Sequence, residues 1–125
     1  MLADFPVRPT LPASDMDRAK HFYENTLGFK ISDEAVDGVT FASADSEFFV
    51  YPTGHAGTAQ NTAVCWVVPD LDSAMTDLRS RGVTFEEYDL PEFKTEGGVA
   101  EGEGVRAAWF KDTEGNILGL AQRTN

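Results

Sequence analysis

Apolar side chains recur with helical spacing in two segments of the chain. In the first segment they form one stripe made of Met16, Ala19, Phe22, Tyr23 and Leu27. In the second, Leu71, Ala74, Met75 and Leu78 occupy positions i, i+3, i+4 and i+7. A stripe of this period is typical of an amphipathic helix that buries one face. Each segment follows an aspartate, Asp15 or Asp70, and ends at a glycine, Gly28 or Gly82, so both ends carry helix signals.

Short β-like runs surround the two predicted helices. One run precedes each helix, PVRPTLPAS before the first and TAVCWVVP before the second. Three runs follow each helix: 30–34, 39–44 and 47–52 in the first half, then 83–87, 105–111 and 117–122 in the second. The sequence Asp112-Thr113-Glu114-Gly115 has the composition of a hairpin turn that ends in a left-handed glycine.

The order of elements indicates an internal repeat. Asp15-Met16-Asp17-Arg18-Ala19 is echoed by Asp70-Leu71-Asp72-Ser73-Ala74, and each copy lies in a βαβββ unit. We therefore predict an α+β fold made of tandem βαβββ modules that form a curved mixed sheet. The expected organisation is one domain, with module one at 5–52, a linker at 53–61 and module two at 62–122. A ferredoxin-like βαββαβ domain is the competing topology, although it provides too few strands.

Composition and charge limit the classes of function. The 125 residues include 42% hydrophobic ones, enough for a globular core, and the formal net charge is −11. This negative net charge disfavours binding to nucleic acid or to anionic membranes, because both carry negative charge themselves. A single cysteine, Cys65, and the absence of a secretion signal or an apolar span favour a cytoplasmic protein.

Three stretches resemble the vicinal oxygen chelate superfamily of glyoxalases, bleomycin resistance proteins and dioxygenases. They are ASDMDRAKHFYENTLGFKI, VPDLDSAMTDLRSRGVTFEEYDLP and AAWFKDTEGNILGLAQ. The resemblance implies that each module curls into half a cup, with metal ligands on the inner face of its first and last strands. It also covers lyases, oxygenases and non-catalytic sequestering proteins, so it is more specific for the fold than for function.

The positions where the resemblance places metal ligands hold unsuitable residues. On the first strands they are Arg8 and Ala63, and on the last strands Gly119 and either Val50 or Tyr51. A transition metal or zinc ion requires converging imidazole and carboxylate groups. We therefore expect no metal and no cofactor. A relocated site that uses His55 and Glu47 stays open as an alternative.

Five residues are candidates for binding a small organic molecule: Arg8, Phe41, Phe48, Tyr88 and Trp109. Arg8 on the inner face is expected either to clamp an anionic group of the ligand or to pair with an acidic residue. Trp109 matches a cavity-facing position in related fosfomycin-resistance enzymes and offers a stacking surface, whereas Trp66 is expected to face the helix as part of the core.

An acidic insertion lies in the second half. Residues 86–103 contain seven acidic side chains and one lysine, and include Tyr88, Phe93 and three glycines, with a fourth, Gly104, directly after them. They are interpreted either as a solvated flap or as a mobile lid that attracts a cationic molecule.

The leading hypothesis is a metal-free, small-molecule-binding protein, with drug or metabolite sequestration as its activity and a cationic or aromatic ligand. A glyoxalase-like lyase or isomerase with an altered or missing metal site is the alternative, and the sequence does not decide whether the chain is an enzyme. We expect a homodimer, because an open cup leaves sheet edges and an apolar seam to be covered.

Overall fold

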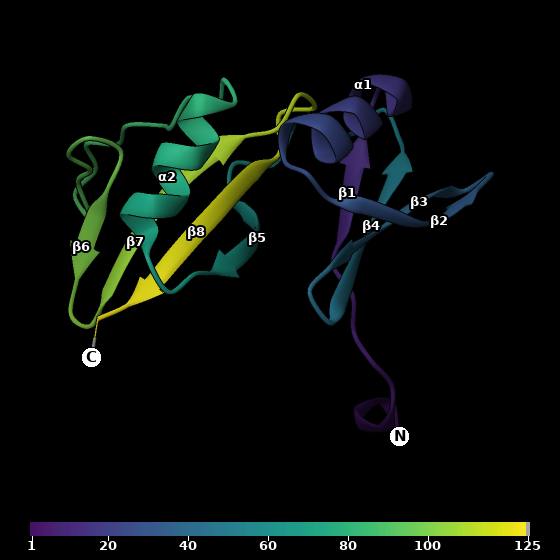
Figure 1. The fold of residues 1–125 in the computed structure, drawn as a ribbon, viewed down its shortest axis with the longest axis horizontal. Coiled ribbons are helices and arrows are strands. Elements are labelled where there is room, and N and C mark those ends of the chain that lie inside the picture. Colours follow the sequence, from purple (N-terminus) through teal and green to yellow (C-terminus); the bar gives the residue numbers. More distant parts are fainter. Residues whose placement is uncertain (125) are drawn as a thin grey trace.

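The computed structural model describes residues 1–124 and contains two four-stranded sheets, each with helical structure on one face (Figure 1). The first module consists of β1 (Thr10–Ala13), α1 (Met16–His21), the π-helical turn η2 (Phe22–Thr26), β2 (Lys30–Ala35), β3 (Gly38–Ser43) and β4 (Ser46–Pro52). The second consists of β5 (Thr62–Val67), α2 (Leu71–Ser80), β6 (Ala100–Gly102), β7 (Val105–Lys111) and β8 (Ile117–Arg123). A short turn, η1 (Leu2–Asp4), precedes the first module.

The two sheets have the same topology. Their strand orders are β1-β4-β3-β2 and β5-β8-β7-β6, and in each sheet the first strand runs parallel to the last. This duplicated βαβββ arrangement confirms the predicted α+β class and excludes the ferredoxin-like alternative. Within residues 1–124, no helix has the length and apolar character needed to cross a membrane.

Both predicted helices begin at the predicted residues. The side chain of Asp15 accepts a hydrogen bond from the Arg18 amide at 3.1 Å, and that of Asp70 accepts one from the Ser73 amide at 3.1 Å. Each carboxylate thus satisfies a backbone donor that the helix leaves free. The predicted stripes face the sheets: Ala19, Tyr23, Leu71 and Met75 are buried, and the other members are partly buried against the same core.

One predicted strand is wrong. Residues 83–87 form only an isolated bridge, between Phe85 and Phe110, and the outer strand of the second sheet is β6. Val83 and Phe85 are both buried, and the Phe85 ring packs edge-on against Phe110 at 5.7 Å. The alternating apolar residues therefore mark an extended segment that fills the core beneath α2, not a strand paired along its length.

The turn between β7 and β8 joins the two modules. The Glu114 carboxylate has no exposed surface, and it accepts hydrogen bonds from the backbone amides of Ser14 and Asp15 at 3.0 and 2.9 Å. The Arg18 guanidinium donates to the same carboxylate at 2.8 and 3.1 Å. A side chain of the second module thus holds the start of α1, which belongs to the first.

Asp112, in the same turn, makes a second link between the modules. Its carboxylate accepts hydrogen bonds from the Tyr23 hydroxyl at 2.5 Å and from the backbone amides of Glu114 and Asn116. The Asn116 side chain donates to the carbonyl of Pro12 in β1 at 2.8 Å. Burial and the nearby Asp112 charge raise the pKa of Tyr23 well above its usual value, so the phenol stays protonated and remains a donor.

Two glycines allow the linker to pass close to this turn. Gly57 and Gly115 have φ values of 79° and 87°, in the region that favours glycine. A Cβ atom on Gly57 would lie 2.8 Å from the Glu114 carbonyl oxygen, and one on Gly115 would lie 2.8 Å from the Cα atom of Gly57. Since neither contact leaves room for a side chain, the linker is held against the turn.

The hydrogen bonds to Glu114 make stability depend on pH. Burial alone would raise the pKa of this carboxyl, but Arg18, the Asp15 amide and the Thr113 hydroxyl outweigh that effect and lower the pKa from 4.5 to about 2. The folded state therefore binds this proton more weakly than the unfolded state does. The resulting stability, at most about 3 kcal/mol, is present above pH 4.5 and is lost as the pH falls toward 2.

We expect Glu114→Gln to lower the free energy of unfolding by about 3 kcal/mol at pH 7. The uncharged side-chain amide is a poorer acceptor for Arg18, and its own N–H groups would face the N–H donors that now bind the carboxylate. Urea denaturation at pH 7 and at pH 3 measures the effect, and the difference from wild type should shrink at pH 3. The matched control is Glu24→Gln, which changes an exposed helical glutamate and should alter stability by less than about 0.5 kcal/mol. An equal loss at both pH values would show that the charge of Glu114 is not its source.

Candidate functional site

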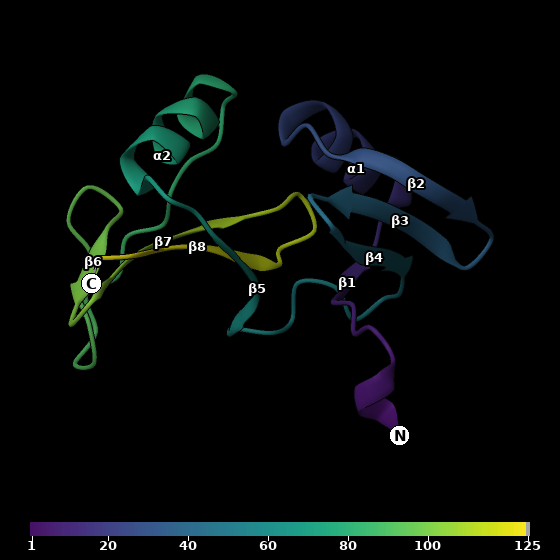
Figure 2. The same ribbon diagram turned by 60° about the horizontal axis from the view of Figure 1, so that its bottom comes forward.

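Each sheet has one face turned away from its helix, which we call the open face. Successive strand residues alternate between the two faces, and in β4 the buried Phe48 and Val50 lie on the helix side. Phe49 and Tyr51 therefore lie on the open face of the first module. Their rings are stacked with centres 6.4 Å apart, within the range of about 4.5–7 Å typical of aromatic pairs. Both helices lie on the other side of the sheets (Figure 2).

Arg8 lies on this open face, just before β1. Its guanidinium carbon is 4.4 Å from the centre of the Phe49 ring, and its Nη1 donates to the Thr40 hydroxyl at 3.3 Å. Among residues 1–124, no carboxylate lies within salt-bridge distance of Arg8. The guanidinium is exposed, so its remaining N–H groups can donate to an acceptor of a bound molecule.

A recess opens beside Arg8. It has a volume of about 480 Å³ and is lined by Pro6, Val7, Arg8, Ala42, Ala44, Asp45, Ser46 and Glu47. These residues come from the segment before β1 and from the hairpin formed by the end of β3, the following turn and the start of β4. Arg8 is the only cation among them.

Phe41 and Phe48 do not belong to this surface, and the structure does not bring them together with the other predicted binding residues. Both are almost fully buried, and their rings lie 5.5 and 5.4 Å from the ring of Tyr23, on the helix side of the sheet. Thr10 and Pro12 alternate with the buried Leu11 and Ala13 in β1, and this pattern was the available signal for the correct face.

Trp109 and Tyr88 come together in the second module, as part of an aromatic cluster. The Trp109 ring lies 5.7 Å from Tyr88 and 5.1 Å from Phe93, and its indole N–H donates to the Thr62 hydroxyl at 3.1 Å. The cluster borders a recess of about 210 Å³ lined by Gln60, Asn61, Thr62, Tyr88, Leu90, Phe93, Trp109 and Ile117. All three aromatic side chains are half-buried, so each keeps part of its surface available.

The acidic segment 86–103 is held by internal hydrogen bonds. The Glu87 carboxylate accepts from the Thr95 hydroxyl at 2.6 Å and from the Gly98 amide at 2.9 Å, and these bonds lower the pKa of Glu87. Arg79 of α2 donates to the carbonyl of Gly97 at 3.0 Å. The segment is thus attached to the helix at one end and to Trp109, through Tyr88 and Phe93, at the other. Its suggested role as a mobile lid stays a prediction.

The residues at the expected metal positions do not fit a metal ion. Arg8 and Ala63 provide no ligand atom, and Val50 is buried on the helix side, which leaves Tyr51 as the open-face residue of that pair. Gly119 faces Trp109, since a Cβ atom there would lie 3.5 Å from the indole. Across residues 1–124, no three histidine, cysteine or acidic side chains are grouped as metal ligands. His55 is exposed in the linker, and Glu47 accepts a hydrogen bond from Ser32.

Trp66 faces the helix side, as alternation along β5 predicted. It is half-buried, stacks on Phe29 at 5.5 Å and contacts Phe48 at 5.9 Å. Cys65, its neighbour, is exposed on the other face, and partial burial raises the pKa of its thiol. The exposure of Cys65 agrees with the position of β5, an edge strand whose open face has no covering layer.

Comparison with known proteins agrees with this architecture. The family model for the Glyoxalase/Bleomycin resistance protein/Dioxygenase superfamily matches residues 6–120. No curated protein sequence matches the chain.

Solved structures with the same fold share about a fifth of their residues with this chain. UcmS2 is 20% identical, with a TM-score of 0.74 and coverage of 94% of this chain and 98% of that one. A bleomycin-binding protein in complex with bleomycin is 22% identical, with a TM-score of 0.73 and coverage of 95% and 98%. A lactoylglutathione lyase from Agrobacterium tumefaciens is 15% identical, with a TM-score of 0.68 and coverage of 94% and 92%.

The family model spans both modules, and the strand order, the duplicated helices and the turn at 112–115 agree with it. The chain belongs to the Glyoxalase/Bleomycin resistance protein/Dioxygenase superfamily.

Proposed function

We propose that this protein binds and sequesters a small, cationic, aromatic organic molecule on its open faces without using a metal ion. The observation that carries the proposal is that the expected metal positions lack metal-binding side chains, while aromatic rings form a stacking surface on the open faces. Phe49, Tyr51 and Trp109 lie on the open faces, and the expected metal positions hold Arg8, Ala63 and Gly119. Flat aromatic side chains and one guanidinium suit non-covalent capture.

The charge of the chain supports a cationic ligand. The formal net charge is −11, and the acidic segment 86–103 borders the Trp109 recess through Tyr88, Leu90 and Phe93. A field of one sign attracts a ligand of the opposite sign and raises its association rate. Arg8 would then donate hydrogen bonds to a neutral or anionic acceptor within that ligand.

Two structural relatives agree with capture as the activity. One is a bleomycin-binding protein complexed with bleomycin, and another, 22% identical with a TM-score of 0.62, is the antibiotic-binding protein TnmS3 from Streptomyces sp. CB03234. The likeness to a lactoylglutathione lyase favours the second candidate, a lyase or isomerase of the same superfamily. The lyase or isomerase would have to turn over a substrate, whereas capture requires neither turnover nor a metal ion.

We further propose that the protein is a homodimer in which a second copy covers residues 1–7. This segment projects away from both sheets (Figures 1 and 2) and exposes Met1, Leu2, Phe5 and Val7 at 95%, 89%, 68% and 94% of their surface. Four large apolar side chains on so short a segment favour burial in an interface. Arg8 follows this segment directly, so the interface would border the open face of the first module.

The capture proposal is tested by calorimetric titration with bleomycin and related cationic glycopeptide drugs. We expect binding by the wild type and a loss of about 2 kcal/mol in Trp109→Ala, because a ligand loses its main stacking surface. Arg8→Gln should lose about as much, since a charged donor is removed, whereas Lys20→Gln, which removes a positive charge from α1 outside the open faces, should leave affinity unaltered. Flat heats across the whole drug class would overturn the proposal.

Elemental analysis of protein purified without chelator distinguishes the two candidate functions. We expect less than about one-tenth of an equivalent of nickel, zinc, manganese or iron, because the described residues lack a set of converging ligands. About one equivalent of any of these metals, retained after dialysis, would favour the lyase or isomerase.

The dimer is tested by sedimentation velocity on the wild type and on a variant with Leu2→Asp, Phe5→Asp and Val7→Asp combined. We expect the wild type to sediment as a dimer and the variant as a folded monomer, since three charges would have to be buried in the interface. Val36→Asp is the control, because Val36 is fully exposed in the β2–β3 turn. A wild type that stays monomeric at about 100 μM, a concentration above the dissociation constant expected for a specific dimer, would contradict the proposal.

A further inference from the structure

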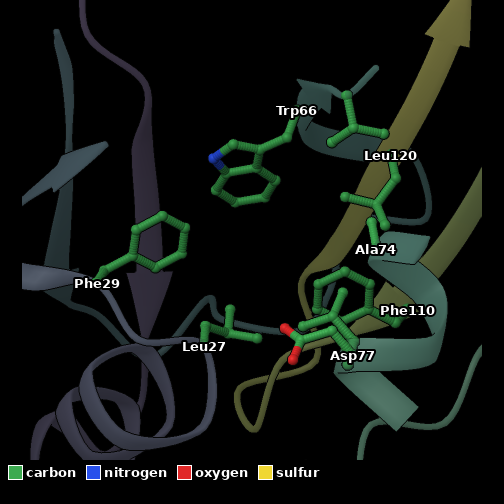
Figure 3. A pocket seen from close by; sticks show the side chains of 9 residues that line it. Leu27, Phe29, Trp66, Ala74, Asp77, Phe110 and Leu120 are labelled. Atoms are coloured by element: carbon green, nitrogen blue, oxygen red, sulfur yellow. The ribbon is translucent and has the colours of Figure 1, made fainter. Parts of the chain in front are cut away.

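A cleft separates the two modules on the side where the helices lie, opposite the open faces. Leu27 and Phe29 of the first module form one wall (Figure 3). The second module provides the rest of the lining, from β5, α2, β7 and β8: Trp66, Val68, Ala74, Asp77, Leu78, Phe110 and Leu120. The cleft has a volume of about 210 Å³. An apolar cavity of about 150 Å³ is enough to bind benzene, so this one has room for a single ring with a short side chain.

The walls of the cleft are apolar apart from one side chain. Trp66 has a polar group, but its indole N–H already donates to the Ser43 hydroxyl at 3.1 Å. Phe29 stacks on the Trp66 ring at 5.5 Å, which fixes the two rings at one end of the cleft (Figure 3). Wherever a ligand touches the lining of this open cleft, it therefore meets hydrocarbon or aromatic side chains, except at Asp77.

Asp77 supplies the single charge in the lining. Figure 3 shows its carboxylate turned toward Leu27 across the cleft. One carboxylate oxygen lies 3.2 Å from Nε of Arg81, the residue directly after α2, and both side chains of this pair are exposed. Such a pair contributes little to stability, so a second cation can compete with Arg81 for the carboxylate.

We propose that this cleft is a second binding site, for a small aromatic amine whose ring lies between the modules and whose ammonium group pairs with Asp77. The charge of the lining selects against anions, because a ligand carboxylate would face Asp77. The net charge of −11 acts in the same direction. The site is independent of the open-face function proposed above, since it lies on the opposite side of the sheets and shares no lining residue with either open-face recess.

The position of the cleft gives binding a structural effect. Its two walls belong to different modules, so an amine bound there contacts both and favours the arrangement in which they are packed together. A ligand that binds only the folded state raises the unfolding temperature as its concentration increases.

The test uses three probes of nearly equal shape: 2-phenylethylamine, 2-phenylethanol and phenylacetate. Two-dimensional ¹H–¹⁵N NMR reports on both sites at once, because the chain has two tryptophans and only Trp66 lies in the cleft. We expect the amine to shift the Trp66 indole signal, to leave that of Trp109 unmoved, and to bind about 5- to 10-fold more tightly than the alcohol, as a charge-assisted hydrogen bond predicts. Phenylacetate should bind more weakly than the alcohol.

Variants on the helix surface identify the residues responsible. Asp77→Asn should remove the preference for the amine over the alcohol, whereas Arg81→Gln should strengthen amine binding about 2- to 5-fold by removing the competing cation. Asp72→Asn is the matched control, since it also breaks an arginine pair on α2 but lies outside the cleft. Ala74→Phe should fill the cleft and abolish binding of all three probes. Should Ala74→Phe fail to fold, the Asp77→Asn and Arg81→Gln variants still test whether the amine binds at Asp77.

The proposal is overturned if about 10 mM amine leaves the Trp66 signal unmoved, since this concentration is well above the dissociation constant expected for a ligand of this size. It is also overturned if phenylacetate binds as tightly as the amine, or if Asp77→Asn and Asp72→Asn behave alike. A shift of Trp109 alone would assign the amine to the open face and count against the cleft. A null result in the cleft would leave the drug titrations unaffected, so the two proposals fail separately.

Discussion

The buried carboxylate of Glu114 is the contact on which the arrangement of the two modules depends. It lies in the turn between β7 and β8, yet its partners are the backbone amides of Ser14 and Asp15 and the side chain of Arg18 in the first module. A charge without exposed surface is tolerable only when its hydrogen bonds are all in place. The turn therefore fits one position against α1, and the relative orientation of the two open faces follows from that position.

Local signals predicted much of this fold. The aspartate caps, the 3.6-residue stripes and the strands on either side of the final turn depend on neighbours in sequence, and the structure confirms them. The sequence also marked the turn at Asp112–Gly115, but only as a hairpin. It could not show that Glu114 and Asp112 point into the other module, because that contact spans almost 100 residues.

The candidate site shows where pattern alone fails. Phe41, Phe48 and Phe49 are chemically alike, and only the alternation of the sheet decides that the first two fill the core and the third lies beneath Arg8. Trp109 and Tyr88 were predicted as binding residues, and the structure brings them together with Phe93, although whether they bind a ligand stays a prediction. Val83 and Phe85 give a second example. Their alternation reflects burial of one face of an extended segment, which looks the same in sequence whether or not the segment pairs as a strand.

The two helices are supported in unequal ways. The start of α2 is held within its own module, where the amide of Leu71 donates to the side chain of Gln122 at 2.7 Å. The start of α1 relies on Glu114, far along the chain. During synthesis, the ribosome releases the N-terminal half well before residues 112–116 exist, so that half cannot complete its own packing as it emerges. The buried partners of Asp15 and Tyr23 are therefore among the last residues of the described chain to be made.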